Sequence, residues 1–212
     1  YHIFVQYFLR GFHRFFLAIH GLEVYTGTRR RTLLVDFLLE EVDVWMGGKQ
    51  DIRKNSFLIK MFGKFSIQYG DRIITDDIGR VKKVWMLIEY LIANREKAVS
   101  QEKLIEVLWS EEECENPTGA LKNLVYRARN VLKKLGETVG HEAIQYVRNT
   151  YAWNNQIPCH VDVEEFEKMC QKAASHDCDV ESKIDCYQRA IRLYKGEFLP
   201  KSSYADWVGA KN

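Results

Sequence analysis

A short basic segment is the part of this sequence whose side chains are best suited to binding a charged partner. Residues 121–136, LKNLVYRARNVLKKLG, carry five basic side chains and no acidic one, while the preceding residues 111–115 read EEECE. The whole chain of 212 residues has a formal net charge of only +2, so this charge is a local feature. Clustered Lys and Arg favour a partner with negative charge, such as a phosphate backbone.

The basic segment has the period of an amphipathic helix. Asn116 followed by Pro117 is typical of a helix start, and Gly136 is typical of a helix end. We therefore expect a helix over 117–135 with one buried and one exposed face. The residues expected to face the core are Leu121, Leu124, Val125, Ala128, Val131, Leu132 and Leu135.

The opposite face of this helix has the side chains of a nucleic-acid reader. Lys and Arg neutralise phosphates or bind guanine, Asn pairs with adenine, and Tyr contacts a phosphate or a base edge. Arg129 lies near the edge of the apolar stripe, so we expect it to bind a phosphate or to pair within the protein. A solvated helix face usually mixes charge signs, so the absence of acids favours DNA. The candidate DNA-binding residues are Lys122, Asn123, Tyr126, Arg127, Arg129, Asn130 and Lys133.

The neighbouring segments predict the elements that would position this helix. FLIKMF, FSIQYG and DRIIT, within residues 57–75, alternate in polarity and predict antiparallel strands. Residues 80–95 and 101–109 have helical periods, and AVS between them predicts a very short strand. After the basic helix, IQYVR and YAWN predict a hairpin with its turn at Asn149-Thr150. This order predicts a winged helix-turn-helix of the α+β class.

Helical segments are predicted on both sides of the winged helix-turn-helix. Residues 1–46 predict two amphipathic helices, for which packing on a neighbour is favoured over an interfacial membrane helix because basic residues are few. Residues 157–212 predict an all-α, tetratricopeptide-like segment that we expect to be truncated, because such arrays need several units. We therefore divide the chain into 1–56, 57–156 and 157–212.

Several of these segments together resemble a known family. Residues 56–109 resemble the first half of an OmpR-type winged helix, ALKNLVYRARNVLKKLG resembles its recognition helix, and IQYVRNTYAWN resembles its wing. VDVEEFE, AIRLYKGEFLP and YADWV resemble the start of the bacterial transcriptional activator domain. The combination, over about residues 57–208, is similar to a SARP-type bacterial transcriptional activator.

The resemblance implies a cytoplasmic, sequence-specific DNA-binding transcription regulator that activates. It implies that helix 117–135 enters the major groove and that Arg148, Asn149 and Thr150 lie in the wing, although the family's glycine-rich turn is here Asn149-Thr150. The implied partners are double-stranded DNA, RNA polymerase and a second copy, as a homodimer or in tandem on direct repeats. The C-terminal helices would contact the partner proteins.

Other classes of function are less well supported by the sequence. The five cysteines are irregularly spaced, which is typical of reduced thiols, and His160 and His176 accompany no tight Cys pair, so we expect no metal. The chain has no phosphate-binding glycine loop and no G-x-S-x-G, so we expect no enzyme, catalytic residue or cofactor. No apolar run is long enough to span a membrane. One alternative stays open, a signalling adaptor whose winged helix and helical repeats bind proteins and not DNA.

Overall fold

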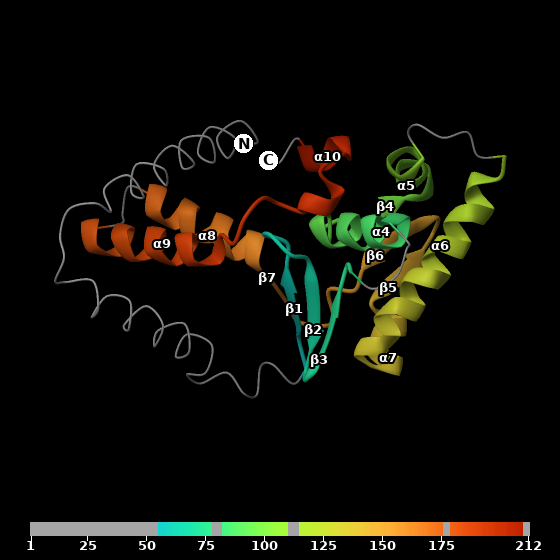
Figure 1. Ribbon diagram of the computed structural model, residues 1–212, viewed down its shortest axis with the longest axis horizontal. Coiled ribbons are helices and arrows are strands. Elements are labelled where there is room, and N and C mark those ends of the chain that lie inside the picture. The colour runs from blue at the N-terminus through green and yellow to red at the C-terminus, as the bar shows by residue number, and fades with distance from the viewer. Residues whose placement is uncertain (1–54, 78–81, 110–114, 176–178, 210–212) are drawn as a thin grey trace.

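The computed structural model describes residues 55–77, 82–109, 115–175 and 179–209 (Figure 1). The two helices predicted within 1–46, nearly all of the linker before residue 57 and most of the acidic loop 111–115 lie outside these ranges.

A four-stranded sheet forms one layer of the molecule. Its first three strands are antiparallel neighbours, as predicted: β1 (Phe57–Lys60), β2 (Ser66–Tyr69) and β3 (Arg72–Thr75). The fourth strand, β7 (Cys159–Val161), pairs in parallel with β1 and gives the order β3-β2-β1-β7. The prediction of an all-α segment from residue 157 is therefore wrong at this strand. Three residues are too few to show a period, and their partner lies far back in the chain.

Helices pack on this sheet and carry the basic segment. The predicted order is confirmed: α4 (Lys82–Ala93), β4 (Val99–Ser100), α5 (Gln101–Leu108) and α6 (Pro117–Leu132). The Ser100 hydroxyl caps α5 by accepting a hydrogen bond from the backbone N–H of Lys103 at 3.1 Å. Asn116 Oδ1 caps α6 in the same way, at 2.9 Å from the N–H of Gly119.

The end of α6 is continued by two short elements. A 3-10 turn, η1 (Lys133–Leu135), completes the predicted span 117–135, and Gly136 follows it as predicted. The next helix, α7 (Glu137–Glu142), was not predicted. It packs so closely that a Cβ on Gly140 would lie 2.3 Å from the carbonyl carbon of Leu132.

The predicted hairpin forms the wing. Strands β5 (Ile144–Val147) and β6 (Thr150–Trp153) are antiparallel, and β4 pairs with β6 in a second, three-stranded sheet. Arg148 and Asn149 form the turn, with φ values of 47° and 64°. The turn therefore lies one residue earlier than the predicted Asn149-Thr150. A two-residue hairpin turn of type I′ has positive φ at both central positions, and here those are Arg148 and Asn149.

The C-terminal helices form the predicted antiparallel pair, α8 (Asp162–Ala174) and α9 (Val180–Leu193). Asp162 joins this pair to β1, because its carboxylate accepts hydrogen bonds from the N–H groups of Met61 at 2.8 Å and Phe62 at 3.1 Å. A 3-10 turn, η2 (Pro200–Ser202), and α10 (Asp206–Gly209) were not predicted, and they return the chain to α4. Residues on both sides of the boundary drawn at 156–157 share one hydrophobic core.

Candidate nucleic-acid interface

Helix α6 lies along one edge of the molecule, opposite the end formed by α8 and α9 (Figure 1). Of the seven candidate residues on α6 and η1, five are exposed, and their side chains have no hydrogen bond or ion pair with another described residue: Lys122, Asn123, Tyr126, Arg127 and Asn130. Tyr126 is 66% exposed, unusually open for an aromatic ring. The residues expected to face the core are buried, apart from Val131, which is half-buried.

The other two candidates, Arg129 on α6 and Lys133 at the start of η1, are bound within the protein. The Lys133 ammonium lies 2.6 Å from Glu137 Oε1 at the start of α7. Arg129 Nη2 donates a hydrogen bond to the carbonyl oxygen of Ile144 at 2.7 Å, which fastens α6 to the first strand of the wing. The intramolecular pairing expected for Arg129 is therefore present. Both side chains hold neighbouring elements in place, and they are less available to an external partner than the five exposed side chains.

A hollow with basic walls opens beside the exposed face of α6. Its volume is about 550 Å³, and Lys83 Nζ lies over the ring of Trp109, 5.0 Å from the centroid. Arg127 and Asn123 form the wall on the α6 side, and no acidic residue lines the hollow in the described part of the chain. The positive potential of α6 therefore extends to the start of α4. The lining residues are Lys82, Lys83, Trp109, Ala120, Asn123, Leu124 and Arg127.

The three predicted wing residues differ in how their side chains are held. Asn149 Oδ1 accepts hydrogen bonds from Gln101 Nε2 at 3.1 Å and from the Tyr146 hydroxyl at 2.9 Å. The Thr150 hydroxyl donates to the carbonyl oxygen of Val147 at 2.6 Å. Arg148 is exposed and has no such bond to another described residue. The wing thus presents one free cation, on the same part of the molecule as α6.

Sequence reasoning missed Gln101. It directly follows the N-cap of α5, where no motif marks a partner for its side chain. The antiparallel pairing of β4 with β6 places the start of α5 beside the wing turn, and this proximity exists only in the fold.

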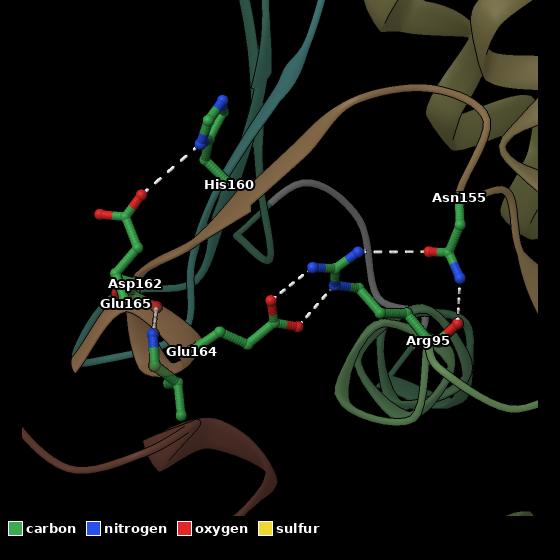
Figure 2. A network of polar contacts seen from close by, with 7 residues as sticks. Arg95, Asn155, His160, Asp162, Glu164 and Glu165 are labelled. Carbon is green, nitrogen blue, oxygen red and sulfur yellow. Dashed lines mark hydrogen bonds and ion pairs between the residues drawn. The ribbon is translucent and has the colours of Figure 1, made fainter. Parts of the chain in front are cut away.

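A second polar cluster joins α4 to α8, away from α6 (Figure 2). Arg95 forms a bidentate pair with Glu164, with Nη2 2.5 Å from Oε2, and its Nη1 donates to Asn155 Oδ1 at 3.3 Å. Asn155 Nδ2 donates back to the carbonyl oxygen of Arg95. Beside this cluster, His160 Nδ1 lies 3.5 Å from Glu165 Oε1. Each cationic group in the cluster has an anionic partner, so it joins elements and offers no free charge to DNA.

The cysteines of the described residues do not gather into a site. Cys159, Cys170 and Cys186 are free, and burial raises the pKa of Cys159 to about 12 and of Cys170 to about 11, so these two thiols stay protonated at neutral pH. No group of three His, Cys, Asp or Glu side chains that could hold a metal occurs within the same ranges. His176 and the other two cysteines lie outside them.

None of the helices that the structure describes is both long enough and apolar enough to cross a bilayer.

Comparison with known proteins adds a family and a fold. Residues 76–150, from before α4 to the end of the wing turn, match the family "Transcriptional regulatory protein, C terminal". Among solved structures, Mycobacterium tuberculosis EmbR in complex with a low-affinity phosphopeptide is similar, with 17% sequence identity and a TM-score of 0.56. The alignment covers 74% of this chain and 40% of the EmbR chain, so this chain spans less than half of EmbR. No curated protein sequence matches.

These findings agree with the geometry. The family match includes α6 and the wing turn, and the likeness to EmbR supports the fold of a winged helix followed by helices. Fold alone does not establish function, but the family match concerns the same segment as the exposed basic face. The chain therefore carries an OmpR-type winged helix in an α+β fold with a helical C-terminal part, and these features support a transcription regulator.

Proposed function

We propose that the chain is a sequence-specific DNA-binding transcription regulator, an activator, that reads the major groove with α6. The observation that carries this proposal is the outer face of α6, where Lys122, Asn123, Tyr126, Arg127 and Asn130 are exposed and make no hydrogen bond or ion pair with other described residues. Side chains that are exposed and have no partner within the described structure are available to an external partner. The absence of acids along the helix restricts that partner to one with negative charge.

The types of these side chains fit base edges. Arg127 matches the O6 and N7 acceptors of guanine, and Asn123 and Asn130 match the N6 and N7 pair of adenine. A 16-residue helix is about 24 Å long, enough to follow the groove over several base pairs. We assign Lys122 and Tyr126 to phosphates or base edges on either side.

Phosphate contacts on both sides of α6 would set its register on the duplex. On one side, Lys82 and Lys83 line the hollow at the start of α4. On the other side, Arg148 extends from the wing turn toward a minor groove or the backbone. Arg129 and Lys133 act indirectly, because the first holds the wing strand and the second holds α7.

We assign protein contacts to the C-terminal helices. Val180 and Ile184 on α9 are 75% and 53% exposed, which leaves apolar surface for a partner. The resemblance to SARP-type activators implies two partners for these helices: RNA polymerase and a second copy bound to an adjacent direct repeat. This part of the proposal rests on the family resemblance more than on the charge of α6.

The DNA-binding proposal is tested with paired variants. A library of duplex DNA with a randomised centre is enriched for sequences that the wild-type chain retains, and affinity for the enriched duplex is then measured. We expect Lys122→Ala/Arg127→Ala to weaken binding by about thirty-fold or more, since each base-edge contact contributes about 1 kcal/mol or more. The control is Lys168→Ala/Lys172→Ala, which removes the same charge from exposed positions on α8. Equal affinity of wild type and α6 variant would refute the assignment.

The alternative is a signalling adaptor whose winged helix binds proteins. The similar EmbR structure contains a phosphopeptide, which gives this alternative one specific motivation. An adaptor would retain no enriched duplex, and any DNA affinity would be equally reduced by both charge-removing pairs. Loss of affinity confined to the α6 pair therefore separates the two functions.

A further inference from the structure

We infer that Gln101 is a positioning residue for DNA binding, which holds the wing turn so that Arg148 reaches the duplex. The inference rests on the proposed function and adds to it a residue that lies on α5, outside both the reading helix and the wing. Gln101 itself is 7% exposed and touches no DNA in this account.

The backbone of Gln101 is the first link to the wing. Pairing of Ser100 with Thr150 brings the first residue of α5 beside the turn. The Gln101 N–H then donates to the carbonyl oxygen of Asn149 at 3.1 Å. The first N–H groups of a helix have no partner within the helix, so this contact satisfies one of them and fixes the turn at the same time.

The side chain of Gln101 forms the second link. Its Nε2 donates to Asn149 Oδ1 at 3.1 Å and to the Tyr146 hydroxyl oxygen at 3.2 Å, while that hydroxyl donates to Asn149 Oδ1 at 2.9 Å. The three groups form a closed triangle. Its only buried member is Gln101, so the orientation of the two exposed wing side chains is set from inside the protein.

The wing turn needs such support. Arg148 and Asn149 are consecutive non-glycine residues at φ 47° and 64°, a conformation that L-residues adopt at a cost. Gln101 binds Asn149 through both its backbone and its side chain. Arg148 then has one defined backbone conformation, with its guanidinium free of hydrogen bonds to the other described residues. Pre-organisation of this kind increases affinity because less freedom is lost on binding.

The hydrogen bonds of the Gln101 side chain to other described residues are directed only at the wing. Gln101 Oε1 is buried and has no hydrogen-bond partner in the described structure, which is unfavourable for folding. Met would occupy a similar volume without that unsatisfied oxygen. The amide is therefore best explained by its Nε2, which is directed at the wing.

The inference is tested by a double-mutant cycle on the enriched duplex, with the full 212-residue chain. Gln101→Met removes the Nε2 donor without adding charge. We expect Gln101→Met and Arg148→Ala each to weaken binding by about five-fold, the effect of about 1 kcal/mol. The double variant should also bind about five-fold more weakly than wild type, because the second substitution removes nothing that the first has left. The matched cycle pairs Gln101→Met with Lys122→Ala, where the two factors should multiply. A purely structural role for Gln101 would give independent effects in both cycles.

Tyr146→Phe provides a second variant that removes one hydroxyl from the triangle and keeps the ring against Tyr151, where the centroids lie 4.9 Å apart. It should show the same coupling to Arg148→Ala, in a weaker form. If the fold-changes of Gln101→Met and Arg148→Ala multiply in the double variant while Lys122→Ala still weakens binding, this inference is wrong and the proposed function stands. If the wild-type chain retains no duplex at all, both fall together.

Discussion

Glu89 is a buried acid that fastens the C-terminal segment to the winged helix. It lies on α4 with 1% of its surface exposed, and its Oε2 accepts a hydrogen bond from the Ser202 hydroxyl at 2.5 Å. Burial, assisted by nearby Asp76, raises the pKa of Glu89 from 4.5 to about 7, although the Ser202 hydrogen bond and Lys201 oppose the rise. Its protonation state therefore changes near neutral pH.

The raised pKa predicts that the fold loses stability as pH rises. Between pH 4.5 and 7 the folded chain keeps a proton that the unfolded chain has released, so the free energy of unfolding falls across this window. The loss attributable to Glu89 is about 3 kcal/mol by pH 8. Glu89→Gln keeps an acceptor for Ser202 and cannot ionise, so we expect it to match wild type at pH 4.5 and to exceed it by up to that amount at pH 8.

Urea unfolding at a series of pH values measures this difference. Glu96→Gln, at an exposed position just after α4, is the matched control and should keep the wild-type profile. Parallel profiles for wild type and Glu89→Gln would show that Glu89 is ionised in the folded chain throughout this range.

At the scale of elements, the contact between α6 and α7 is set by one glycine. Gly140 lets α7 pack against the end of α6, where a Cβ would lie 2.3 Å from both the Leu132 carbonyl carbon and the Lys133 nitrogen. Those neighbours are backbone atoms, so they cannot rotate away. Moving α7 would also displace Glu137, the partner of Lys133.

Gly140→Ala should therefore destabilise the protein, although alanine is the better helix former. We expect a loss of more than about 2 kcal/mol in the free energy of unfolding, as for overpacked sites. Gly209→Ala is the control, because a Cβ there has no atom within 4 Å among the described residues. Denaturant unfolding of both variants measures the effect. A Gly140→Ala protein as stable as the control would contradict this packing.

What the sequence could predict differs from element to element for physical reasons. Helix α6 was predictable because its signals are local: the cap at Asn116, the proline after it and a long apolar stripe. Strand β7 and helix α7 were missed because each is short, and their existence depends on partners elsewhere in the fold. The wing turn was placed one residue late, because backbone φ and not residue type alone defines it.

The residues of the candidate site also differ in whether the sequence alone could predict their roles. Exposure of Lys122 and Arg127 follows from helical spacing, so the sequence could predict it. The ion pair of Lys133 with Glu137 and the Gln101 contacts to the wing required tertiary structure. Side chains that shape the interface were therefore harder to find than side chains that face solvent.

At the scale of the whole molecule, one end of the described structure brings basic side chains from three elements together. The hollow beside α4, the outer face of α6 and the wing turn each contribute basic side chains, whereas Arg95 near the junction with α8 is paired with an acid. One hydrophobic core extends from the sheet to α8 and α10, so the basic end and the C-terminal helices form a continuous body. Such an asymmetric charge favours approach to DNA from one side.

The salt dependence of DNA binding tests this account most directly. If about five phosphates are neutralised, the logarithm of the binding constant should fall with the logarithm of salt concentration with a slope of about −4 to −5. Lys122→Ala/Arg127→Ala should make the slope shallower by about 1, since loss of a phosphate contact by Lys122 removes about 0.9, whereas Arg127 is assigned to a base edge. Lys168→Ala/Lys172→Ala should leave it unchanged. A wild-type slope near zero, or an equal slope in the α6 variant and wild type, would contradict the claim that α6 binds DNA.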